Sequence, residues 1–80
     1  MNEKIFKGII QCINNITGKT ATITPQTLLE DGLEMSSLDK VRLQVELEEY
    51  FAFNFDPLDD FTAIFMSAGS LYDYIAKKVN

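Results

Sequence analysis

The sequence predicts an all-α protein: a four-helix bundle with a long loop between the first and second helices and a short third helix. Two observations predict this fold. Apolar residues recur at the spacing of a helix face, and residues suited to capping a helix precede the apolar stretches. A chain of 80 residues has room for one modest core, so residues 1–80 are expected to form a single domain.

The first helix is predicted to begin near Ile5 and to end near Gly18. Asn2 can cap its start, and Gly18 can close it because glycine readily takes the left-handed conformation. Cys12 lies at the edge of the apolar face without a basic neighbour to stabilise a thiolate, so we expect a buried, unreactive thiol. The apolar face consists of Ile5, Phe6, Ile9, Ile10, Ile13 and Ile16.

Residues 19–35 are predicted to form mostly a loop, because they are rich in threonine, contain Pro25 and Gly32 and show little periodicity. Thr24-Pro25 could start a local turn of helix, since a capping residue precedes a proline there. So long a loop in a small domain is expected to cross the bundle and link distant helix ends.

The second helix is predicted to begin after Ser36 and to run to about Phe51, with Ser36 and Asp39 forming a capping box. A helical projection separates two apolar stripes, Leu43, Leu47, Tyr50 and Phe51 on one side and Leu38, Val41 and Val45 nearly opposite. The first stripe is expected to face the core. Two interpretations of the second stay open: a further core face beneath the long loop, or an apolar strip that meets partner proteins.

A short third helix is predicted to start at Asp56-Pro57, where an aspartate cap precedes a proline in the first turn. It is expected to bury Leu58, Phe61 and Phe65.

The last helix is predicted to begin after Ser67 as its cap. Lys77 and Lys78 would lie favourably at its negative end. Its apolar residues are Leu71, Ile75 and Val79.

Composition excludes several classes of function. Twelve acidic and seven basic residues give a net charge of −5, which disfavours nucleic acids and anionic lipids and favours basic protein partners. The chain has no histidine and is too short for a deep cleft, so we expect no catalytic residue, no metal site and no enzyme activity. With no long apolar block and a single cysteine, it is expected to be cytoplasmic and without membrane insertion. We also expect a monomer.

Two segments carry a resemblance to a known family. Residues 31–39 (Asp-Gly-Leu-Glu-Met-Ser-Ser-Leu-Asp), followed by Leu43, Leu-Glu-Glu at 47–49 and Phe51, resemble the acyl carrier protein signature around its Asp-Ser-Leu motif. Residues 67–71 (Ser-Ala-Gly-Ser-Leu) with Asp-Tyr-Ile at 73–75 are similar to the Thr-Val-Gly-Asp-Leu and Asp-Tyr-Ile pattern of the family's last helix. The resemblance covers most of the chain and implies a bundle of the acyl carrier protein type.

The resemblance implies that Ser37 is the attachment site of 4'-phosphopantetheine, which a phosphopantetheinyl transferase takes from coenzyme A. Only this register puts Leu38 after the serine and aligns the Leu-Glu-Glu run at 47–49. Ser36 then stands where the family has aspartate. The segment between Asp31 and Ser37 is also one residue longer than the commonest spacing in the family. The arm would hold acyl or aminoacyl cargo as a thioester, and fatty acid, polyketide, peptide and aminoacyl systems all stay open.

The resemblance also implies that the second helix binds partner enzymes: the transferase and the ligases, synthases or transferases that load cargo. Lys40 and Arg42 lie among the acidic residues of this helix and reduce its net negative charge. This indicates a dedicated partner whose surface carries charges of both signs. Two alternatives to a carrier remain, a carrier-like bundle without the prosthetic group that acts as an interaction module, and a small enzyme that uses carboxylates. The predicted partner-binding residues are Leu38, Asp39, Val41, Arg42, Val45, Glu46 and Glu49.

Overall fold

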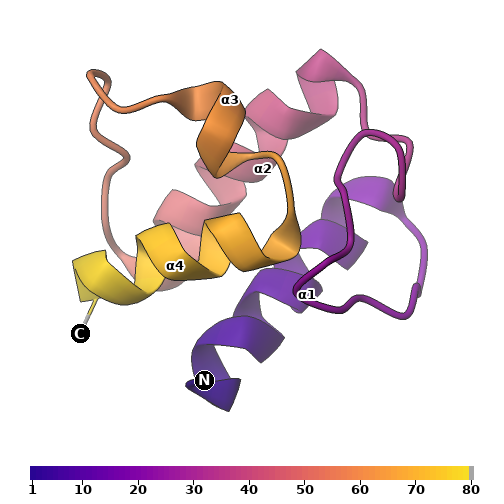
Figure 1. Cartoon of the computed structure of the whole chain (residues 1–80), viewed down its shortest axis with the longest axis horizontal. Coiled ribbons are helices and arrows are strands. Elements are labelled where there is room, and N and C mark those ends of the chain that lie inside the picture. The colour runs from indigo at the N-terminus through magenta and orange to yellow at the C-terminus, as the bar shows by residue number, and fades with distance from the viewer. Residues whose placement is uncertain (80) are drawn as a thin grey trace.

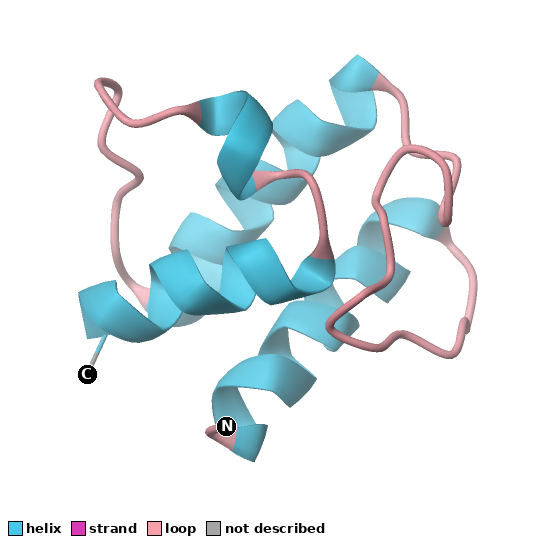
Figure 2. Cartoon of the chain, in the orientation of Figure 1, coloured by secondary structure: helices cyan, strands magenta, loops and turns pink. Residues whose placement is uncertain are grey.

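Four α-helices make up the regular structure of residues 1–79, the part of the chain that the computed structural model describes (Figure 1, Figure 2). They are α1 (Glu3–Thr17), α2 (Ser37–Phe51), α3 (Phe61–Ile64) and α4 (Ala68–Val79). Within these residues no β-strand forms, and the all-α bundle predicted from the sequence is confirmed. None of the helices in residues 1–79 has the combination of length and apolarity that crossing a bilayer demands.

Both predicted ends of α1 are confirmed. The side chain of Asn2 accepts hydrogen bonds from the backbone N–H groups of Lys4 (3.0 Å) and Ile5 (3.3 Å), two of the four that a helix start leaves without partners. At the other end Gly18 has φ 70°, and its N–H donates to the carbonyl of Asn14 (2.8 Å). A residue with a side chain would be strained there, which explains why a glycine ends the helix.

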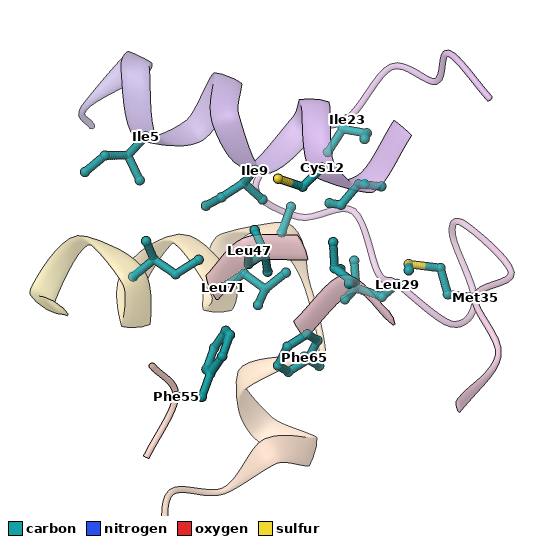
Figure 3. Close-up of a cluster of buried hydrophobic side chains, with 14 residues drawn as sticks. Ile5, Ile9, Cys12, Ile23, Leu29, Met35, Leu47, Phe55, Phe65 and Leu71 are labelled. Carbon is teal, nitrogen blue, oxygen red and sulfur yellow. The ribbon is translucent and has the colours of Figure 1, made fainter. Parts of the chain in front are cut away.

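The bundle core lies where α1, α2 and α4 meet. Figure 3 shows Ile9 of α1, Leu47 of α2 and Leu71 of α4 converging in its centre, and all three are fully buried. Residues from the loops complete the core: Ile23, Leu29 and Met35 from the loop between α1 and α2, and Phe55 from the loop before α3. Burial of this apolar surface is the main force that holds the helices together.

The C-terminal end of α2 packs closely on α1. A Cβ atom placed on Gly8 would lie 2.6 Å from Cε1 of Tyr50 and 2.7 Å from Cζ of Phe51, so only glycine lets these rings approach the helix. Leu43 and Leu47 are buried as predicted. Tyr50 was also predicted to face the core, but it is 49% exposed: its ring lies against Gly8 of α1 at the edge of the helix pair, and only part of it is covered.

The loop between α1 and α2 contains no helix and is joined by hydrogen bonds to the start of α4. Thr24 begins a tight turn closed by the N–H of Thr27 (3.0 Å), where a turn of helix was considered. The carbonyls of Pro25 and Thr27 then accept from the N–H groups of Gly69 (2.9 Å) and Ala68 (3.0 Å). The loop therefore spans the distance between the end of α1 and the start of α2 while covering one end of the core, as expected.

The third helix starts later than predicted. It spans Phe61–Ile64 and is capped by Asp60, whose Oδ1 accepts from the N–H of Ala63 (3.2 Å). The predicted start at Asp56-Pro57 is wrong, because Asp56 forms a turn instead. Its Oδ1 accepts from the N–H of Leu58 (2.9 Å), which is a common alternative to helix capping for this residue type.

Leu58 was predicted to be buried, and this prediction is wrong: its side chain is 92% exposed. The hydroxyl of Tyr74 on α4 holds the surrounding loop, accepting from the N–H of Asp56 (2.9 Å) and donating to Oδ2 of Asp59 (2.6 Å). These bonds leave Leu58 outside the core. Phe65, by contrast, is buried as predicted, and Phe61 is partly buried.

The start of α4 is capped as predicted. The N–H of Ser70 donates to Oγ of Ser67 (3.0 Å), and the N–H of Ser67 donates to Oγ of Ser70 (3.0 Å). Lys77 and Lys78 occupy the last turn, where positive charge interacts favourably with the helix dipole.

Candidate functional site

Ser37, the candidate modification residue, is the first residue of α2 and is exposed. Ser36 precedes it as the cap: its Oγ accepts from the N–H of Asp39 (3.1 Å), and Oδ2 of Asp39 accepts from the N–H of Ser36 (3.2 Å). The predicted capping box is therefore confirmed. Because Ser36 and Asp39 close the helix start together, the hydroxyl of Ser37 has no structural task in the cap.

Two backbone donors lie beside this hydroxyl. Within residues 1–79 the N–H groups of Ser37 and Leu38 donate to no protein acceptor, since the capping box uses only those of Ser36 and Asp39. Free N–H groups at the positive end of a helix are a favourable environment for a phosphate. The start of α2 therefore fits a phosphodiester on Ser37.

Removing the cap should cost stability while leaving the hydroxyl of Ser37 in place. Ser36→Ala is expected to lower the free energy of unfolding by about 1 kcal/mol, because the N–H of Asp39 loses its acceptor. Urea denaturation followed by circular dichroism measures the change. Ser36→Asp, which keeps a capping acceptor, should stay close to the wild type, and equal losses for both variants would contradict this account of the cap.

An apolar strip runs along the outer face of α2 from this serine. Leu38 is 66% exposed, Val41 51% and Val45 50%, so the interpretation of these residues as a second core face is wrong. Three adjacent apolar side chains left in water on one helix face form a surface suited to binding another protein.

The structure separates the predicted partner-binding residues into two groups. Leu38, Val41, Arg42, Val45 and Glu49 are exposed. Asp39 and Glu46 are half-buried and already hydrogen-bonded: Asp39 in the capping box, and Oε2 of Glu46 with Nδ2 of Asn15 on α1 (3.0 Å).

A hollow next to the start of α2 was not foreseen from the sequence. Its volume is about 270 Å3, and Lys40 lines it one turn after Ser37. Nζ of Lys40 lies 2.7 Å from Oε2 of Glu30, a residue in the long loop. No sequence periodicity links these two residues, so only the folded loop reveals their pairing. The other lining residues are Leu28, Asp31, Thr62 and Met66.

Cys12 is fully buried, as predicted. Burial, with a smaller contribution from the negative charge of Glu46, raises the pKa of the thiol to about 12. A thiol without thiolate character and without solvent access is a poor nucleophile. Cys12 is therefore part of the core. Separately, no group of three or more potential metal ligands occurs in the region from residue 1 to 79.

Alkylation should report this burial. At pH 9 iodoacetamide is expected to modify Cys12 in the folded protein at least about 100-fold more slowly than in the urea-unfolded chain, with glutathione as a reference thiol. Because the thiol ionises near pH 9.0 when unfolded, the stability that it contributes is complete below that pH and is lost as the pH rises from 9.0 toward 12. Equal alkylation rates in both states would contradict a buried thiol.

A curated relative defines the family. The chain is 32% identical over 75 residues to the acyl carrier protein of Acidothermus cellulolyticus, an alignment that covers 92% of this chain and 87% of the relative. The chain belongs to the acyl carrier protein family. This membership supports a carrier role for the chain. No family model matches the sequence, and no solved structure matches it.

Proposed function

We propose that this protein carries acyl or aminoacyl cargo as a thioester on a 4'-phosphopantetheine arm attached to Ser37, and delivers it to partner biosynthetic enzymes. One observation carries the proposal: an exposed serine at the first position of α2, next to two backbone N–H groups without a protein acceptor. Membership of the acyl carrier protein family supports the same carrier role.

Each part of the helix start has a task in this proposal. The hydroxyl oxygen of Ser37 would form the phosphoester bond, losing its proton and displacing adenosine 3',5'-bisphosphate from coenzyme A, and the N–H groups of Ser37 and Leu38 would lie near the phosphate charge at the positive helix end. The capping box of Ser36 and Asp39 fixes the helix so that these donors keep their positions. When attached, the arm supplies a thiol at the end of a long flexible tether, and the protein itself contributes no catalytic group.

The partners in this proposal are a phosphopantetheinyl transferase and the ligases, synthases or transferases that load and use the cargo. They would meet the protein along the exposed apolar strip of α2, defined by Leu38, Val41 and Val45, because this strip begins next to Ser37. The working compartment is the cytoplasm, where a lone cysteine such as Cys12 stays reduced.

Incubation with coenzyme A, Mg2+ and a broad-specificity phosphopantetheinyl transferase tests the proposal. Intact-mass measurement is expected to show the addition of one phosphopantetheinyl group per chain. A mass that stays unchanged under conditions that modify a known carrier would contradict the proposal. That result would favour the alternative of an interaction module without the group, an alternative suggested by Ser36 in place of the family's aspartate.

A further inference from the structure

Most charged side chains of α2 are held by groups within the protein. The helix carries six of them, and four have partners. Asp39 and Glu46 form the hydrogen bonds described above, and Lys40 pairs with Glu30 in the long loop (2.7 Å). Oε2 of Glu48 accepts from a backbone N–H in the loop that follows α2 (2.9 Å). These four side chains are half-buried and already hydrogen-bonded or ion-paired, so they contribute less to recognition than their number in the sequence suggests.

The other two charged residues of α2, Arg42 and Glu49, are exposed. Across residues 1–79 neither of them forms an ion pair or a side-chain hydrogen bond. They are seven residues apart, which places them on nearly the same line of the helix, about 10 Å from one another along its axis at roughly 1.5 Å per residue. Leu38 and Val45 of the apolar strip lie directly beside this line. The outer face of α2 therefore presents a positive and a negative charge along one side of the apolar strip.

An enzyme that receives an arm on Ser37 must cover the first turns of α2, and Arg42 lies only five residues along the helix. A guanidinium group that loses its water at an interface needs an acceptor in return, because a buried charge without a partner is strongly unfavourable. The same argument applies to the carboxylate of Glu49 farther along the strip. A partner surface that is basic throughout would satisfy Glu49 and repel Arg42.

We propose that the partner of α2 is an enzyme whose docking surface places a carboxylate opposite Arg42, a basic side chain opposite Glu49, and an apolar recess beside these two groups for the strip formed by Leu38, Val41 and Val45. This inference rests on the proposed function and specifies the partner's chemistry. The order of the two charges also fixes the direction in which α2 lies on the partner, and so delivers Ser37 to one end of the contact.

A double charge exchange tests the inference. The partner is first captured in the cells that make the protein by photocrosslinking from Val45→p-benzoylphenylalanine, and is then purified. The affinity of the purified partner is measured for the wild-type protein carrying the phosphopantetheine arm and for the variant with Arg42→Glu and Glu49→Arg. This double exchange keeps the net charge at −5. We expect binding to weaken at least about tenfold, because both pairs become like-charged. Exchanging the two facing residues on the partner should restore the affinity.

A matched exchange on α1, Glu3→Lys with Lys7→Glu, also keeps the net charge, and both residues are exposed. It should change the affinity by less than about twofold, since it lies away from the strip. A captured partner that binds the α2 exchange variant as tightly as the wild type would overturn the inference. Intact mass on the same samples separates the two proposals: an unmodified Ser37 in the wild type contradicts the carrier function, whereas modification with unchanged affinity contradicts only the charge pattern.

Discussion

Phe65→Ala is expected to lower the free energy of unfolding by about 3–5 kcal/mol, the largest stability change among the substitutions considered. The side chain is 1% exposed, and its ring lies against those of Phe61 (4.2 Å between centroids) and Phe55 (5.3 Å). Truncation would therefore open a cavity between α3, α4 and the preceding loop. A protein of this size has only about 5–15 kcal/mol of stability in total, so the variant should be close to unfolding.

Urea denaturation followed by circular dichroism measures this effect. Leu58→Ala is the matched control, because this leucine is also large and apolar but is 92% exposed, and its loss should fall within about 0.5 kcal/mol. Similar losses for the two variants would contradict the assignment of Phe65 to the core and Leu58 to the surface.

Ser37→Ala is expected to abolish phosphopantetheine addition completely, because the substitution removes the oxygen that forms the ester. Ser36→Ala should still accept one group, since Ser36 acts through its hydrogen bond to Asp39 and not through a free hydroxyl. Intact mass after incubation with coenzyme A and the transferase distinguishes the two variants. Circular dichroism of Ser37→Ala should match that of the wild type, because no side-chain hydrogen bond in residues 1–79 depends on its hydroxyl.

The reverse pattern, with Ser36→Ala unmodified and Ser37→Ala modified, would assign the attachment site to the capping residue. That outcome would contradict the register in which Ser37 precedes Leu38 and the Leu-Glu-Glu run at 47–49.

The long helices could be predicted from the sequence because local signals and burial agree in them. In α1 the apolar face, the Asn2 cap and Gly18 all indicate the same limits, and the structure has them. The α2 start was equally clear, since a capping box is a local arrangement of Ser36 and Asp39. Where the helix caps, the apolar spacing and the burial all favour the same helix, one sequence is enough to predict that helix.

The region before α3 could not be predicted in this way. Asp56 and Asp60 are both suitable caps, and Pro57 favoured the first of them. The choice between them is made by Tyr74 on α4, which binds the loop at Asp56 and lies far away in the sequence. Leu58 is exposed for the same reason, because the loop is held against α4 by polar contacts that a pattern of apolar residues does not reveal.

The candidate site was predictable only in part. The place of Ser37 at the helix start follows from the capping box, its candidacy as the modified residue follows from the resemblance to the family signature, and the separation of the two apolar stripes follows from helical geometry. Helical geometry does not show which charges of α2 remain available for a partner. Glu46 is held by Asn15 of α1, and Lys40 is held by Glu30 of the long loop, so both contacts depend on the folded structure. These contacts single out Arg42 and Glu49, a distinction that the sequence could not make.

The most direct test of the carrier function is the chemical state of Ser37 in protein isolated from the cells that produce it. Intact mass followed by fragmentation of the peptide around residues 36–39 would locate any attached group. The account predicts one phosphopantetheinyl group, with or without cargo, bonded to the Oγ atom of Ser37. A bare hydroxyl at this residue in all of the isolated protein, or the group on any other side chain, would contradict it.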